Sequence, residues 1–231
     1  MSEDFNLSLY SDVAELVTAT ASEAMELIAL HLLGKGVCHI ALTGGELGAD
    51  FARELVELIN NSGDLTGLNI WFSDERFAAS DSPLRNSRPV HGGLQNSSVS
   101  VHEVASTNDG VSLFEAAASY DAEIREVKMD LCVLGLGPDG HVASLFPHHW
   151  DPQEKARAIA ITDSPKPPAE RVSFSMAFIN SSAQVWIIAA GKVKADAVRQ
   201  VLEADTSVPA GHVRAVQLTR LFVDSEAFSN K

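Results

Sequence analysis

The strongest constraint on the fold of this chain is a regular alternation of short apolar runs with longer amphipathic segments. The runs at 37–43, 68–74 and 130–137 are rich in β-branched and large apolar residues, which is typical of buried strands. The segments at 12–33 and 49–60 repeat apolar residues at helical spacing. Strands that alternate with helices in this way predict an α/β fold with one doubly wound, mostly parallel sheet and helices on both faces.

The rest of the chain continues the same alternation. Further helices are predicted at 86–95, 110–127 and 194–204, and further strands at 99–104, 157–162 and 183–191. The prolines of 163–175 mark a loop before another extended run. Because no internal repeat, low-complexity tract or long linker interrupts the sequence, we expect residues 1–231 to form a single domain.

Charge and composition limit the classes of partner. Seventeen basic against thirty-one acidic residues give a formal net charge of −14 without a local basic cluster, so nucleic acid is not an expected partner. Cys38 and Cys132 lie in strand-like apolar runs and are interpreted as buried free thiols, not as parts of a disulfide or metal site. No signal peptide is evident, and no apolar run approaches the roughly 20 residues that span a bilayer. We therefore expect a cytoplasmic protein without a membrane partner.

Three polar or glycine-rich loops follow predicted strands. They are TGGELG at 43–48, SDERF at 73–77 and GPDGH at 137–141. In doubly wound sheets ligands bind beyond the carboxyl ends of the strands. The three loops are therefore expected to form one ligand site.

The third loop carries a glycine pattern with two possible meanings. GLGPDG at 135–140 satisfies G-x-G-x-x-G, and Asp163 about twenty residues further on fits the ribose-binding acid of a dinucleotide pocket. A pyrophosphate, however, needs a long helix after the glycines, whereas Pro147 is expected to end this helix after barely two turns. Asp139 would also repel the diphosphate. The pattern therefore argues against a dinucleotide cofactor.

A histidine in this loop offers a different use. His141 follows Asp139 by two residues, and histidine is the side chain whose ordinary pKa, roughly 6.5, suits a general base near neutral pH. An acidic neighbour is expected to raise its basicity. In the alternative interpretation, Asp139 caps the short helix and His141 is a polar residue without a catalytic role.

Longer stretches of the sequence resemble the 6-phosphogluconolactonase family. The similarity rests on LGLGPDGHVASLFP at 134–147, SDERF at 73–77 and the stretch from PPAERVSFS through GKVKADAVRQVL at 167–202, and it continues to PAGHV at 209–213. The resemblance implies hydrolysis of 6-phospho-D-glucono-1,5-lactone to 6-phosphogluconate in the oxidative pentose phosphate pathway. It also implies that the reaction uses no metal and no organic cofactor.

The resemblance assigns roles to individual residues. His141 matches the general base of the family, and Asp139 is expected to orient either this histidine or the substrate. Arg76, in the D-E-R match, and Lys194, in the G-x-x-K match, fall where the family places basic groups for the phosphate and polar face of the substrate. Arg171 matches an arginine that either contacts the substrate or forms a structural ion pair. The first loop adds three substrate-binding candidates: Thr43, Gly44 and Gly45.

The chain departs from the family pattern in two places. Many members carry S-G-G-S-T-P in the first loop, where this chain has a carboxylate at Glu46 and an apolar side chain at Leu47. Since Glu46 would repel a phosphate, we expect it to face solvent or to pair with a basic residue. Arg85 stands where members often have serine, and it offers an additional phosphate contact.

Two other functions compete with lactone hydrolysis. Glucosamine-6-phosphate deaminases share the D-G-H element, but they place a glutamate where this chain has Phe146, so only Asp74 could imitate their base. A noncatalytic sugar-phosphate sensor is the second alternative. Sensors of this kind that act as regulators need a DNA-reading module, and no basic helix-turn-helix segment precedes Asp12.

Overall fold

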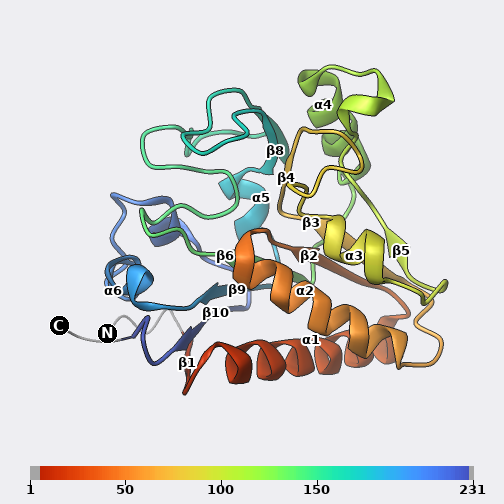
Figure 1. The fold of residues 1–231 in the computed structure, drawn as a ribbon, viewed down its shortest axis with the longest axis horizontal. Helices are drawn as coiled ribbons and strands as arrows, with labels where there is room; N and C mark the ends of the chain where they lie inside the picture. Colours follow the sequence, from red (N-terminus) through yellow and green to blue (C-terminus); the bar gives the residue numbers. More distant parts are fainter. Residues whose placement is uncertain (1–5, 229–231) are drawn as a thin grey trace.

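A seven-stranded parallel sheet forms the centre of the computed structural model, which describes residues 6–228 (Figure 1). The strands lie in the order β1-β10-β9-β6-β2-β3-β5, and every neighbouring pair is parallel. The predicted α/β fold with a mostly parallel sheet is thus confirmed. The strands are β1 (Asn6–Tyr10), β2 (Cys38–Leu42), β3 (Leu68–Phe72), β5 (Ser100–Val101), β6 (Leu131–Gly135), β9 (Gln184–Ala189) and β10 (Leu218–Asp224).

A second, smaller sheet lies over one face of the first. It is antiparallel and consists of β4 (Asp74–Arg76), β8 (Arg171–Phe174) and β7 (Ala158–Ile161), in that order. The run predicted as a strand at 157–162 therefore pairs here and not in the parallel sheet. This arrangement matters for the site, because β4 continues directly from the end of β3 and pairs Arg76 with Arg171.

Helices cover both faces of the parallel sheet. One face is covered by α1 (Val13–Lys35), α2 (Gly45–Asn60) and α3 (Arg88–Gly93), and the other by α4 (Leu113–Glu123), α5 (Met176–Asn180), α6 (Ala195–Leu202) and the small sheet. Successive strand residues alternate between the two cores, so that Ile40 faces α1 and α2 while Ala41 faces the other layer. Because both faces are covered, the central strands β2, β3, β6 and β9 are apolar along most of their length.

Helix α1 is close to the helical segment predicted at 12–33, but it is longer and more apolar than expected of a segment that cannot span a bilayer. It has 23 residues with a window of mean hydropathy 1.4, so by length and composition alone it could cross a membrane. The expectation that no stretch approaches this length is therefore wrong. Leu16, Ala24 and Ile28 are nevertheless buried against the sheet and α2, which is also typical of a helix that belongs to the core of a folded domain.

The segment after β6 does not form the short helix predicted there. Residues 136–149 fold into successive turns that are held by isolated bridges, among them Leu136 with Val142. The Gly137 N–H donates to the carbonyl of His141 at 2.9 Å, which closes a tight loop. Two glycines and a proline within four residues disfavour a helix at this place. Asp139 therefore caps no helix, and that interpretation is wrong.

The order of the strands creates a crevice between β2 and β6. From β2 the chain proceeds outward to β3 and β5, whereas from β6 it proceeds in the opposite direction to β9 and β10. At such a switch point the connections leave the sheet in opposite directions, and a ligand can bind at the carboxyl ends of the two strands. The TGGELG and GPDGH loops leave from this point.

Candidate active site

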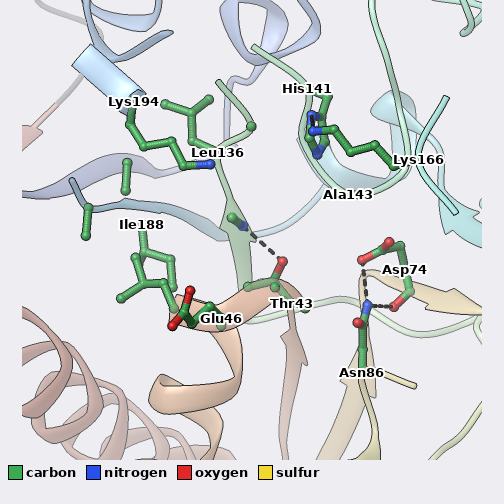
Figure 2. A pocket seen from close by; sticks show the side chains of 18 of the residues that line it. Thr43, Glu46, Asp74, Asn86, Leu136, His141, Ala143, Lys166, Ile188 and Lys194 are labelled. Atoms are coloured by element: carbon green, nitrogen blue, oxygen red, sulfur yellow. Dashed lines mark hydrogen bonds between the residues drawn. The ribbon is translucent and has the colours of Figure 1, made fainter. Parts of the chain in front are cut away.

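A cavity of about 720 Å³ opens at the carboxyl ends of β2, β6 and β9 (Figure 2). Most of the side chains around it come from the three loops that the sequence singled out, from the loop before β8, and from the end of β9 and the segment that follows it. Of the predicted site residues, only Asp139 does not line the cavity, but it contacts His141, which does. The others all line it: Thr43, Gly44, Gly45, Arg76, His141, Arg171 and Lys194.

His141 is held in one orientation by its neighbours. Its Nδ1 makes a close hydrogen bond to the carboxylate of Asp139, and its ring stacks on Phe146 with 4.3 Å between centroids. With Asp139 accepting from Nδ1–H, the lone pair of the neutral ring resides on Nε2. A side chain at residue 137 would collide with the imidazole, since a Cβ there would lie 1.8 Å from Nδ1. Gly137 is therefore required for this placement of the ring.

Burial decides the protonation of His141. Desolvation lowers the pKa of this imidazole, and the hydrogen bond and charge of Asp139 offset the effect only in part. Lys166 lowers the pKa further. The expectation that an acidic neighbour makes the histidine more basic is thus outweighed by burial. Near neutral pH the ring is uncharged and able to accept a proton.

Lys166 is the site residue that sequence reasoning missed. Its Nζ lies 3.4 Å from His141 Nδ1, 3.7 Å from Asp139 Oδ1 and 5.6 Å from the centroid of the Phe146 ring. Figure 2 shows the side chain reaching toward His141. In the sequence, this lysine stands among the prolines that mark a loop, and only its closeness to Arg171 in the chain distinguishes it.

Arg171 combines the two roles that the sequence left open. The guanidinium is buried and lines the cavity, yet Nη2 donates to the carbonyl of Lys166 at 2.8 Å and Nε to that of Pro168 at 3.1 Å. Nη1 lies 3.9 Å from the carboxylate of Asp74. Arg171 thus anchors the loop that carries Lys166, in addition to placing positive charge at the wall of the cavity.

Arg76 and Lys194 add positive charge at other parts of the wall. One Nη of Arg76 donates to the carbonyl of Leu84, and its buried Nε has no hydrogen-bond partner among the described residues. Figure 2 shows Lys194 entering the cavity from the side opposite Lys166. Burial lowers the pKa of the Lys194 ammonium, and Lys166 lowers it further. The two ammonium groups therefore repel each other across the cavity.

The first glycine loop brings the amino terminus of α2 to the cavity. Gly44 caps this helix without a side-chain hydrogen bond, so the first N–H groups keep no side-chain acceptor. A Cβ on Gly44 would lie 1.9 Å from Asn86 Oδ1, which requires glycine there. Thr43 Oγ1 accepts from the Gly135 N–H at 3.0 Å and ties β2 to β6. Glu46 is exposed, as expected, but it also lines the cavity.

Asp74 is engaged by neighbouring side chains. It is buried, and its two carboxylate oxygens accept from Ser144 Oγ at 2.6 Å and from Asn86 Nδ2 at 3.0 Å. These hydrogen bonds leave it poorly available as a base. Arg85 does not line the cavity and is buried between the carboxylates of Glu75 at 3.7 Å and Glu103 at 3.6 Å. The suggested phosphate contact of Arg85 is therefore wrong.

Comparison with known proteins places this geometry in a family. Residues 11–222 match the family model described as glucosamine-6-phosphate isomerases/6-phosphogluconolactonase. A 6-phosphogluconolactonase of Streptomyces coelicolor is 31% identical over 99% of this chain and 95% of its own length. One of Mycobacterium tuberculosis is 30% identical, with 96% of each chain covered.

Solved structures agree with the sequence relatives. A crystal structure of a 6-phosphogluconolactonase from Thermotoga maritima superposes with a TM-score of 0.82 at 26% identity, covering 95% of this chain and 99% of that chain. A monomeric glucosamine-6-phosphate deaminase shares the fold with a TM-score of 0.79 at 19% identity, covering 96% of this chain and 98% of that one. The match over residues 11–222 and the full-length relatives show that this chain belongs to the glucosamine-6-phosphate isomerase/6-phosphogluconolactonase family.

Proposed function

We propose that this chain is a 6-phosphogluconolactonase that hydrolyses 6-phospho-D-glucono-1,5-lactone to 6-phosphogluconate in the oxidative pentose phosphate pathway. We further propose that residues 1–231 act as a single domain in the cytoplasm. The observation that carries the proposal is the neutral His141, oriented by Asp139 at the wall of a cavity that four other basic side chains also line.

His141 acts as the general base in this proposal. Nε2 takes a proton from a water molecule while the water oxygen forms a bond to the lactone carbonyl carbon. When the tetrahedral intermediate collapses, the bond to the ring oxygen breaks and the imidazolium returns the proton to that oxygen. Asp139 keeps the proton on Nδ1 and stabilises the imidazolium. General-base catalysis of this kind contributes about 10²–10⁴-fold.

Lys166 is the residue best situated to stabilise the oxyanion. Its ammonium is the cation next to His141, at 3.4 Å from the ring, and it is only partly exposed. In this proposal the lactone carbonyl lies between Nε2 and Lys166 Nζ, so that negative charge develops near the ammonium when water attacks. A positive charge already in position stabilises such a transition state more than the uncharged ground state.

The phosphate is bound by groups remote from the reacting carbonyl. The uncapped amino terminus of α2 presents N–H groups and the positive end of the helix dipole. Arg76 lines the cavity, and a guanidinium can grip two phosphate oxygens. Lys194 adds a second cation from the loop after β9. These groups hold the substrate so that its lactone end reaches His141.

Two observations disfavour the deaminase alternative. Phe146, at the position where deaminases carry a glutamate, stacks on His141 and offers no proton acceptor. Asp74, the remaining candidate base, already accepts hydrogen bonds at both carboxylate oxygens. The proposed reaction needs only acid–base and electrostatic catalysis, so no metal or organic cofactor is invoked.

A direct assay separates the three functions. Purified protein is mixed with freshly prepared lactone, and acid release is followed against spontaneous hydrolysis in buffer. A lactonase accelerates acid release, and the same preparation releases no ammonia from glucosamine 6-phosphate. Binding without turnover of either compound would identify a sensor, and ammonia release would identify a deaminase.

A further inference from the structure

A second group of side chains with metal-binding atoms lies at the opposite end of the parallel strands, where the strands begin. We call this end the amino edge of the sheet. His31 comes from the last turns of α1, Cys38 is the first residue of β2, and Asp130 directly precedes β6. Their donor atoms, one nitrogen, one sulfur and one carboxylate oxygen, all lie within 4.8 Å of one another. We name these three residues the amino-edge cluster.

The backbone holds the members of the amino-edge cluster in place. Asp130 Oδ2 accepts from the His39 N–H at 2.9 Å, and the Asp130 N–H donates to the His39 carbonyl at 2.8 Å. The Cys38 N–H donates to the Gly67 carbonyl at 2.9 Å. The bond from the His39 N–H uses Oδ2 of Asp130 and leaves Oδ1 on the side of His31. Donors that are fixed in this way by a second layer of hydrogen bonds are characteristic of metal sites.

The histidine of the cluster has an unused donor atom. His31 Nδ1 is buried and lies 3.2 Å from Asp130 Oδ1, but it makes no aligned hydrogen bond with any described residue. A buried polar atom without a partner is costly, and a ligand that pairs with it recovers this cost. The third donor, the Cys38 thiol, is fully buried beside it.

In the structure, the flexible side chain of Lys35 pairs with the Asp130 carboxylate. Lys35 Nζ lies 2.5 Å from Asp130 Oδ1, and its side chain is 44% exposed. Because this side chain is long and borders solvent, it can leave the carboxylate without disturbing the backbone. A divalent cation at the cluster would then replace one positive charge with two.

We propose that His31, Cys38 and Asp130 bind one borderline divalent transition-metal ion, of which Zn²⁺ is the best example. A nitrogen, a sulfur and a carboxylate oxygen form the ligand set that Zn²⁺ prefers, and water from the exposed side completes the four ligands. On binding, the bond from the metal to Sγ forms as the thiol releases its proton to the buffer, and the Lys35 ammonium moves into solvent. No electron is transferred.

The required movement is small. In a tetrahedral zinc site the ligand atoms are separated by about 3.3–3.8 Å, so a pair of donor atoms in the amino-edge cluster, all within 4.8 Å of one another, must approach by at most about 1.5 Å. The five residues of β2 separate the cluster from the catalytic cavity by about 16 Å at roughly 3.3 Å per residue. The ion would therefore link α1, β2 and β6 without touching the substrate.

The test uses Co²⁺ as a coloured probe of the full-length, reduced protein after treatment with a chelator. We expect one equivalent of Co²⁺ to produce a thiolate-to-metal charge-transfer band in the near ultraviolet. Cys38→Ser should abolish the band. Cys132→Ser should retain it, since this matched variant removes the other buried thiol, on β6. Absence of the band, or its persistence in Cys38→Ser, would overturn the proposal.

A second variant removes the competing cation. Lys35→Met should tighten Co²⁺ binding about tenfold, because the ion no longer has to displace an ammonium group. Lys155→Met, which deletes the same charge from an exposed position elsewhere, should leave the affinity unchanged. Equal effects of the two variants would indicate attraction by net charge only and would contradict a defined site.

Stability provides a readout that does not depend on colour. Zn²⁺ should raise the Tm of the wild type and of Cys132→Ser by several degrees, since an ion that binds the folded state stabilises it by mass action. His31→Phe, at a partly exposed position, should fold normally and lose this rise. If Zn²⁺ raises the Tm of His31→Phe as much as that of the wild type, the ion binds elsewhere and the assignment fails.

Discussion

A histidine, an aspartate and a lysine lie together at each end of the parallel strands, which we call the carboxyl edge and the amino edge, but their surroundings differ. At the carboxyl edge, His141 contacts Asp139 with Lys166 beside them, and at the amino edge His31 lies against Asp130 with Lys35 beside them. The first trio adjoins the cavity, which His141 and Lys166 line, whereas none of the second trio lines it.

The difference teaches what turns such a trio into a catalytic site. At the carboxyl edge the loops diverge at a topological switch point, and the amino terminus of α2 and further cations face the same space. At the amino edge Asp130 is fixed by the backbone of a neighbouring strand, and a thiol stands beside the histidine. The same side chains therefore suit proton transfer to a substrate at one edge and ion binding at the other.

The largest expected effect is a loss of kcat that depends on which of the two histidines is replaced. His141→Ala should lower kcat by about 10²–10⁴-fold with the fold retained, because the base is lost. His31→Ala, the matched variant at the opposite edge, should leave kcat unchanged. Both are measured as acid release from fresh lactone, with circular dichroism as the control for folding. Near-normal turnover by a folded His141→Ala would remove His141 from the chemistry.

The next effect concerns the phosphate. Arg76→Ala should raise KM about 10–100-fold with a smaller change in kcat, because hydrogen bonds to a charged group contribute about 1.5–3 kcal/mol and this contact is remote from the carbonyl. Arg199→Ala, which removes an exposed arginine paired with Asp196, serves as the control and should leave KM unchanged. An unchanged KM in Arg76→Ala would exclude Arg76 from the phosphate site.

The smallest effects are two shifts of opposite sign in the pH profile. Lys166 lowers the pKa of His141, so Lys166→Met should move the acid limb of kcat/KM to higher pH and also reduce kcat about tenfold. Asp139 raises this pKa, so Asp139→Asn should move the limb to lower pH. Lys35→Met and Asp130→Asn should move it in neither direction. Shifts of the same sign in the first two variants would contradict the arrangement around His141.

Much of the parallel sheet could be predicted because its signals are local. The apolar runs that became β2, β3, β6 and β9 are bounded by glycines or polar residues, and both sides of each strand are buried. Once these strands are predicted, the positions of the loops at their ends are predicted as well. The strands β1 and β10 escaped prediction: no residue of β1 is fully buried, and β10 contains an arginine.

Other parts depend on contacts between distant segments, which no local pattern reveals. The second sheet exists because β4, only three residues long, pairs with β8 almost a hundred residues later. Lys166 reaches His141 because Arg171, on β8, holds the carbonyl of residue 166. The predicted helix after β6 gave way to turns for a partly local reason, the two glycines and the proline, and the turn is also fixed from a distance because the Ala210 N–H donates to the carbonyl of Gly140.

The most direct test of the account is the pH dependence of lactone hydrolysis, measured as kcat/KM between pH 5 and 8 and corrected for the spontaneous reaction. Burial lowers the pKa of His141, and the base is active only when neutral, so activity should persist below pH 6.5 and fall at lower pH as the imidazole protonates. The residual activity of His141→Ala should lack this acid limb. A flat profile for the wild type, or the same limb in His141→Ala, would contradict the claim that this histidine is the base.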